Sequence, residues 1–237
     1  MNLNGKNLFI SKPGHWDQIP DIHSEDRKRL TQALWKAKSE ISKLYSNLSN
    51  YNDKFKPFHL EHGNIKLDLS RNKSATISIG NHNFYFRHWP DFGKYISGGW
   101  FEEYTYMQLQ PLVESGLILD MRIGLEVSLK KKQSSKSRKK NRSHSIYQEL
   151  DVVFTEGRRL YIVECKAGRV LSAQVMKLQN IIRDFGGVEG RGILASCFPP
   201  YHPVVRQKIV DSKNIKGVSG NIAEEIKRLI QSGRGNQ

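Results

Sequence analysis

The sequence predicts a mixed α/β fold of the α+β type, in which helices flank a sheet centred on a β-hairpin. Three observations support this prediction. Residues 147–166 contain two strands with apolar side chains on both faces, joined by a tight turn at residues 156–159 where Gly157 permits hairpin backbone angles. Helical periodicity precedes and follows this hairpin. Residues 57–88 instead alternate apolar and polar side chains, as expected for a smaller sheet.

Composition points to a globular protein with a polyanionic partner. The chain has 237 residues, of which 38% are hydrophobic and 10% aromatic, enough for a real core. The formal net charge of +15 favours nucleic acid as partner, ahead of an anionic membrane. The two cysteines, Cys165 and Cys197, fall in apolar runs and are expected to be free buried thiols. The sequence shows no signal peptide and no apolar run near ~20 residues, so we expect a cytoplasmic protein without membrane association.

Residues 1–97 are predicted to form an N-terminal arm, a helix and a small β module of the winged, helix-plus-hairpin type. The arm, residues 1–23, reads as irregular, and one helix runs from an N-cap at Ser24 to about Ser46. Three alternating strands follow at residues 65–69, 75–79 and 84–86. Gly and Pro residues between 89 and 99 then mark the boundary to a second domain, residues 98–237.

The second domain is predicted to contain an αβββαβ succession of elements. These are a helix at 100–115, a strand at 117–129, the two hairpin strands, a helix at 172–185 and a strand at 193–198, followed by a terminal helix from Asn221. Lys177 and Gln179 lie where the helix after the hairpin could reach its charged end. Packing or surface positions are equally open to them.

Charged residues interrupt the apolar hairpin. If the hairpin is centred between Gly157 and Arg158, Asp151 lies opposite Glu164, with Cβ atoms about 4.5–5.5 Å apart, and Lys166 points to the same face. Two facing carboxylates in a sheet interior need a compensating cation, which is a divalent metal, Lys166, or both. The alternative is a hairpin held only by ion pairs, namely Glu149–Lys166 and a pair between Glu164 and an Arg or Lys.

A basic segment separates the first strand of this domain from the hairpin, within a loop at residues 130–146. Its eight basic residues, whose removal leaves a net charge of +7, are Lys130, Lys131, Lys132, Lys136, Arg138, Lys139, Lys140 and Arg142. Because the loop joins two strands of the predicted sheet beside the charged hairpin, we interpret it as an arm that binds nucleic-acid phosphates. A localisation signal or a solubilising insertion is the alternative.

Asp151 followed by Glu164-Cys165-Lys166 resembles the core of the PD-(D/E)xK nuclease superfamily. The runs GGWFEEYTY, QELDVVF, RLYIVECKAG and GGVEGRGILAS, between residue 98 and about residue 200, are similar to the nuclease half of CRISPR ancillary nucleases, in which a cyclic-oligoadenylate-sensing CARF domain precedes the nuclease. The resemblance implies a restriction-endonuclease-like αβββαβ core. It also implies hydrolysis of DNA or RNA phosphodiester bonds with Mg²⁺ or Mn²⁺, in antiviral defence.

The resemblance assigns roles to individual residues. It implies Asp151 and Glu164 as metal ligands, the carbonyl of Cys165 as a further ligand, and Lys166 as the residue that orients water or stabilises charge. Glu102 would complete the site, with Glu103 as its alternative. A homodimer is compatible with it. Residues 1–97 lack the alternating strand–helix pattern of the sensor, so either the chain is a partial one carrying linker and nuclease or it acts without that sensor, and activation by cyclic oligoadenylate is not inferred. The rival function is a non-catalytic, basic nucleic-acid-binding protein that retains the fold.

Overall fold

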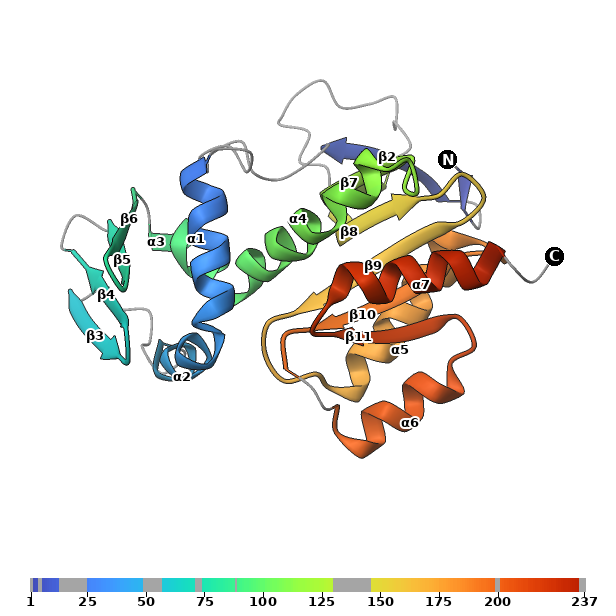
Figure 1. The fold of residues 1–237 in the computed structure, drawn as a ribbon. Helices are drawn as coiled ribbons and strands as arrows, with labels where there is room; N and C mark the ends of the chain where they lie inside the picture. Colours follow the sequence, from blue (N-terminus) through green and yellow to red (C-terminus); the bar gives the residue numbers. More distant parts are fainter. Residues whose placement is uncertain are drawn as a thin grey trace, which may run out of the picture.

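A computed structural model describes residues 2–3, 6–12, 25–48, 57–70, 74–87, 89–129, 146–198 and 201–234. These described residues form two sheets, one of seven and one of four strands. Figure 1 shows the smaller sheet on the left and the larger on the right, with a long helix, α4 (Trp100–Glu114), running from the first part into the second. No helix among these residues is long and apolar enough to cross a membrane.

The larger sheet has the strand order β1-β2-β7-β8-β9-β10-β11. Its strands are β1 (Asn2–Leu3), β2 (Lys6–Lys12), β7 (Asp120–Leu129), β8 (Ile146–Thr155), β9 (Leu160–Lys166), β10 (Arg191–Ser196) and β11 (Ile215–Ser219). The pairs from β1 to β9 are antiparallel, whereas β9, β10 and β11 run parallel. The sheet is therefore mixed, and its parallel strands need helical crossovers.

The predicted hairpin is β8–β9, and its register is the predicted one. Val152 pairs with Val163 and Thr155 with Leu160, which centres the turn between Gly157 and Arg158. Gly157 has a φ of +104°, a value that favours glycine.

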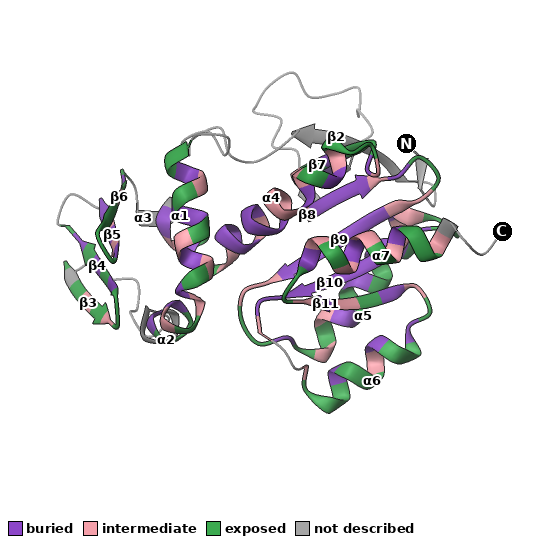
Figure 2. Ribbon diagram, in the orientation of Figure 1, coloured by how far each residue is buried: buried purple, intermediate pink, exposed green. Residues whose placement is uncertain are grey.

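Helices cover both faces of this sheet. Helix α4 and α7 (Ile222–Arg234) pack with Val152, Phe154 and Val163 on one face. Helix α5 (Ser172–Ile181), its π-helical continuation η2 (Ile182–Gly186) and α6 (Pro203–Asp211) pack with Val153 and Ile162 on the other. Figure 2 shows the resulting burial along α4 and the central strands. The order α4-β7-β8-β9-α5-β10 confirms the αβββαβ core.

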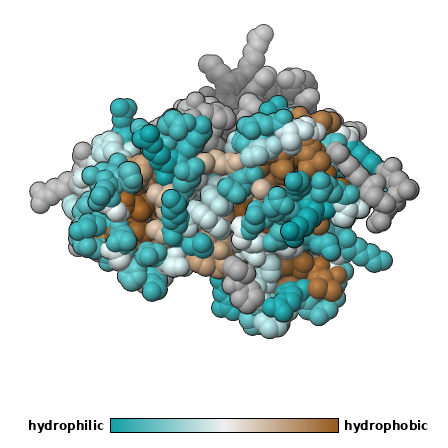
Figure 3. All heavy atoms as spheres, in the orientation of Figure 1, coloured by the Kyte–Doolittle hydropathy of each residue, from teal (hydrophilic) through white to brown (hydrophobic). Residues whose placement is uncertain are grey.

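The N-terminal part is a four-stranded antiparallel meander packed on helices. It comprises α1 (Glu25–Lys36), α2 (Lys38–Leu48), β3 (Phe58–His62), β4 (Ile65–Leu69), β5 (Ala75–Ile79), β6 (His82–Phe86), α3 (Trp89–Lys94) and the π-helical turn η1 (Tyr95–Gly99). Its buried side chains belong to the same apolar cluster that reaches α4 and β8. Figure 3 shows polar side chains over much of the visible outer face of this part. The helix-plus-hairpin prediction therefore describes only part of a module whose described residues form three α-helices, a π-helical turn and four strands.

Three predictions about elements need correction. Residues 6–12 form β2, which pairs with β7, so the irregular arm is wrong there; a neighbouring strand supplies their backbone hydrogen bonds. The single N-terminal helix is divided at Ala37, although hydrogen bonds from Ala37 N to Ala33 O and from Ile41 N to Ala37 O continue across the division. Helix α6 and strand β11, which follow Pro199 and Pro200, were not predicted. The N-cap residue Ser24 and the basic residues between 130 and 142 lie outside the described residues.

Candidate active site

The first candidate residue, Asp151, lies where the β8–β9 ladder ends. The ladder runs from Thr155–Leu160 to Val152–Val163, and if this register were continued by one position it would set Asp151 opposite Glu164. The backbone N–H of Cys165 donates a hydrogen bond of 2.7 Å to Asp151 Oδ2. In a regular ladder, a carbonyl oxygen of β8 would accept the hydrogen bond from this N–H. The Asp151 carboxylate accepts it instead, and the bond fixes the orientation of the carboxylate.

A local irregularity in the neighbouring strand lies opposite Asp151. The pairs Ile123–Val152 and Leu125–Leu150 place Gly124 opposite Asp151, and Gly124 has a φ of +60°. Leu150 and Val153 belong to the same apolar cluster although they are three residues apart, so the in–out alternation of β8 changes at Asp151. We infer that Gly124 helps to set the direction of the Asp151 carboxylate.

Glu164 lies between two lysines. Its carboxylate is 2.7 Å from Lys166 Nζ, and Lys177 Nζ donates to both its oxygens, at 3.1 Å and 3.3 Å. The side chains are progressively exposed: 3% for Glu164, 24% for Lys166 and 47% for Lys177. Lys177 comes from α5, so the helix after the hairpin does reach its charged end. Gln179, the other residue considered there, instead donates to Ser212 Oγ.

The geometry separates the two adjacent glutamates of α4. Glu103 is buried and accepts two hydrogen bonds from Arg27 Nε and one from Arg27 Nη2, at 2.8–3.2 Å, and another from Thr31 Oγ1. It is committed to α1. Glu102 instead interacts electrostatically with the hairpin: burial, and then the charges of Asp151 and Glu149, raise the pKa of Glu102 to about 8. The charge of Asp151 thus acts on Glu102, whereas Glu103 is paired with Arg27 of α1.

The charges of the site are unbalanced towards the negative. Burial, and then the charge of Glu164, raise the pKa of Asp151 to about 7, although Lys166, the Cys165 N–H and Lys177 act in the opposite direction. Burial lowers the pKa of Lys166, but the attraction of Glu164 and Asp151 outweighs it, so the net shift is upward. With Glu149 and Lys94, which also act on Glu102, four carboxyl groups lie near three ammonium groups, and with every group ionised this arrangement favours one more cation.

The donor set fits a hard divalent cation that keeps part of its water. Among the described residues, no three His, Cys, Asp or Glu side chains are grouped so that they could hold a metal by themselves. Burial raises the pKa of the Cys165 thiol, so only its backbone carbonyl is suited to ligate. Asp151, Glu164 and this carbonyl would supply few, oxygen-only ligands. That is the pattern of Mg²⁺, which usually retains several waters.

Other predicted contacts are placed differently. Glu149 forms no ion pair with Lys166. It lies opposite Glu126 in the β7–β8 register, and its Oε1 is 3.5 Å from Lys94 Nζ.

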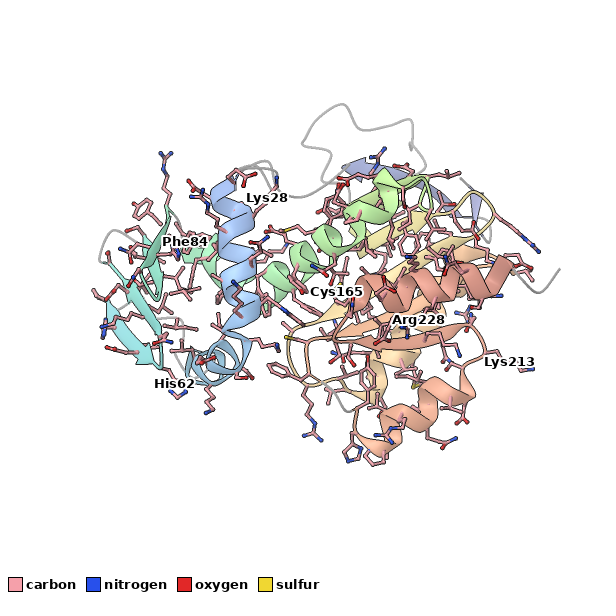
Figure 4. The ribbon with its side chains drawn as sticks, viewed as in Figure 1. Lys28, His62, Phe84, Cys165, Lys213 and Arg228 are labelled. Atoms are coloured by element: carbon pink, nitrogen blue, oxygen red, sulfur yellow. The ribbon has the colours of Figure 1, made fainter. Side chains whose placement is uncertain are left out.

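The eight basic residues predicted to bind phosphates fall outside the described residues, and that prediction stays a prediction. Figure 4 labels Cys165, in the strand that α4 contacts. From the sequence, Lys177 and Gln179 were both candidates to reach the charged end of the hairpin. A position on a helix indicates the side on which a residue lies but not its distance from the hairpin.

The order of elements and the charged hairpin define a restriction-endonuclease-like nuclease fold. The family model "Card1-like, endonuclease domain" matches residues 91–216, just over half of the chain. The chain therefore belongs to the Card1-like endonuclease domain family. The resemblance to CRISPR ancillary nucleases is thereby confirmed. A search of curated proteins found no significant match.

Two solved structures share the fold. Can2 from Sulfobacillus thermosulfidooxidans, in complex with cyclic tetra-adenylate, aligns with a TM-score of 0.57 and 16% identity, over 88% of this chain and 56% of its own. Protein VC1899 from Vibrio cholerae aligns with a TM-score of 0.58 and 14% identity, over 97% of this chain and 59% of its own. The chain thus spans less than two thirds of either structure. At these identities the likeness concerns the fold.

Proposed function

We propose that the protein is a metal-dependent endonuclease that hydrolyses phosphodiester bonds of DNA or RNA in the cytoplasm, in CRISPR-type antiviral defence. The observation that carries the proposal is the meeting of Asp151, Glu164 and Lys166 at one end of β8 and β9, inside the fold of an endonuclease-domain family. The net charge of +15 supports a nucleic-acid partner.

Each residue has a role in this proposal. Asp151, Glu164 and the Cys165 carbonyl would hold Mg²⁺ or Mn²⁺. Such an ion lowers the pKa of a bound water and stabilises charge on phosphate oxygens. The Cys165 N–H holds the Asp151 carboxylate in place. Lys166, 2.7 Å from Glu164, positions its ammonium to orient water and to stabilise the negative charge that develops at phosphorus. Glu102 completes the site from α4.

We propose nucleic acid as the partner and allow a homodimer; the described residues of this chain give no support for activation by cyclic oligoadenylate. The Can2 structure contains cyclic tetra-adenylate, and this chain spans 56% of Can2. The described elements before residue 98 form helices and an antiparallel meander. This arrangement differs from the alternating strands and helices expected of a sensor.

One assay separates the enzyme from a non-catalytic binder. Purified protein is incubated with single-stranded DNA, RNA and plasmid in Mg²⁺, Mn²⁺ or EDTA. We expect cleavage with the divalent ions, no cleavage in EDTA, and losses of at least about 100-fold in Asp151→Ala and Lys166→Ala. Undiminished cleavage by either variant contradicts the mechanism. Binding without cleavage in every condition favours the non-catalytic alternative.

A further inference from the structure

A groove lies beside the charged end of the hairpin. It encloses about 620 Å³ and is lined by Gln148 of β8 and by one side of α5 and η2. Its polar lining residues on the helix, Lys177, Asn180 and Arg183, are spaced three apart, and all three are exposed. Residues at this spacing lie near one another along one side of a helix. The groove therefore begins at Lys177, which contacts Glu164, and continues along a row of hydrogen-bond donors.

The lining suits a strand of nucleic acid. Two of its residues, Lys177 and Arg183, are cationic, and Asp184 is the single acid among the described residues that line it; Arg183 Nε is 3.6 Å from Asp184 Oδ1. Met176, also in the lining, is 54% exposed and offers apolar surface between the polar groups. Cationic side chains beside apolar surface match a ligand with a charged backbone and flat bases.

Lys177 is the residue that connects this groove to the site. Its ammonium contacts both Glu164 oxygens, yet its side chain is 47% exposed. An ion pair that is half open to solvent is exchanged at small cost. Lys166 is only 24% exposed and its ammonium is closer to Glu164, so it is held more firmly than Lys177. A divalent cation on Glu164 would compete with Lys177 for that carboxylate and would release the ammonium towards the groove.

We propose that Lys177 positions the substrate: it exchanges Glu164 for a phosphate of the nucleic-acid strand, which continues along the α5 groove past Asn180 to Arg183. This inference rests on the proposed function, because it places the strand relative to the same carboxylates. The ligand is the phosphodiester backbone of a single or double strand. Figure 1 shows that α5 lies against the sheet on the side opposite α7, which places the groove away from α4.

The control for this inference is another lysine with matched geometry. Lys66 of β4 is 54% exposed, and its Nζ is 3.1 Å from Glu61 Oε1, the same distance as the Lys177–Glu164 pair. It lies in the smaller sheet. Lys66→Ala removes the same charge and an equivalent ion pair without touching the groove. Lys177→Arg keeps the charge and tests rescue.

The experiment measures binding and cleavage separately. Fluorescein-labelled single-stranded and duplex DNA of the same sequence are titrated with protein in EDTA and in Ca²⁺, followed by anisotropy, with gels to verify that the DNA is intact. We expect Lys177→Ala and Arg183→Ala each to weaken binding about five- to tenfold and to reduce the slope of affinity against salt by about one ion. The loss for Lys177→Ala should be larger in Ca²⁺ than in EDTA. Lys177→Arg should bind within about threefold of the wild type.

The outcomes distinguish this inference from the proposed function. If Lys66→Ala and Lys177→Ala bind equally well, the groove assignment is overturned, even where the wild type cleaves DNA. If the wild type cleaves nothing but Lys177→Ala and Arg183→Ala still weaken binding, the endonuclease proposal fails and the groove stands. Where cleavage is measurable, Lys177→Ala should chiefly raise KM, whereas Lys166→Ala lowers kcat. A loss of kcat alone in Lys177→Ala contradicts a positioning role.

Discussion

Arg27 and Glu103 form a buried ion pair that joins α1 to α4, with 2.8 Å between Arg27 Nη2 and Glu103 Oε1. The Arg27 guanidinium also lies over the ring of Tyr95, 3.5 Å from its centroid, and Tyr95 Oη is hydrogen-bonded to Thr31 Oγ1. The pair lies one residue from Glu102, the α4 carboxyl that senses Asp151. The N-terminal helix is thereby connected to the position of the candidate active site.

Arg27→Met should destabilise the protein strongly. The change leaves the Glu103 carboxylate buried and unpaired, which costs about 3–5 kcal/mol in the free energy of unfolding. Urea denaturation at pH 7 measures it. Replacing the exposed Arg29, 67% exposed and 3.9 Å from Asp26, by Met is the control and should change stability by less than about 1 kcal/mol. Equal effects of the two substitutions would contradict the role of the buried pair.

Glu102→Gln and Glu103→Gln should have opposite consequences. Glu102→Gln removes a carboxyl from a negatively unbalanced site, so we expect cleavage to fall at least about tenfold while stability is kept or increased. Glu103→Gln breaks the charge pair with Arg27 and should lower the free energy of unfolding by about 2 kcal/mol or more. Thermal melts and cleavage rates of both variants check this. Greater stability loss in Glu102→Gln would reverse our assignment of the two residues.

Without divalent cations, stability should fall as pH rises. The folded-state pKa of Asp151 is about 7 against a usual 3.8, and that of Glu102 about 8 against a usual 4.5. The folded state therefore binds more protons than the unfolded state, and the stabilisation present at about pH 4 is lost as pH passes through 7–8. Asp151→Asn should remove part of this slope and gain about 1–4 kcal/mol at pH 8. A flat stability profile in EDTA from pH 5 to 8 would contradict the raised pKa values.

Mn²⁺ should stabilise the folded protein, and more so at high pH. A ligand that binds only the folded state adds about 2.7 kcal/mol at 100 times its Kd, and carboxylates must lose their protons to bind a metal. We expect a rise in Tm at pH 8, a smaller rise at pH 6, and none in Asp151→Ala. Glu61→Gln, a carboxylate substitution in the smaller sheet, should keep the full effect. A Tm rise of equal size in Asp151→Ala would place the metal elsewhere.

Gly124→Ala should impair cleavage beyond its effect on stability. At a φ of +60° an alanine adds about 1–2 kcal/mol of strain. If β7 relaxes to remove that strain, the Asp151 carboxylate opposite is displaced. Gly116, which follows α4 with a φ of +71° and has open space where an alanine methyl group would lie, is the matched control. The Tm of both variants should fall by a similar amount, but only Gly124→Ala should reduce kcat by more than about tenfold.

How much of the site was predictable follows from how far apart its parts lie in sequence. The β8–β9 register could be predicted because the two strands are joined by four residues and Gly157 marks the turn. That register alone placed Asp151 opposite Glu164. The αβββαβ order also came from local periodicity, together with the boundaries of α4 to within a residue. The strand β2 escaped prediction because its partner, β7, lies more than a hundred residues away.

The sequence by itself determined the hairpin, the order of the core elements and which charges fall in them, because backbone geometry and side-chain alternation are properties of short segments. Only the tertiary structure decided that Glu103 pairs with Arg27 while the charge of Asp151 acts on Glu102. It also decided that Lys177 rather than Gln179 reaches Glu164. Those choices depend on how separate helices pack on the sheet. Burial and charge then act over a few ångströms of space, irrespective of distance along the chain.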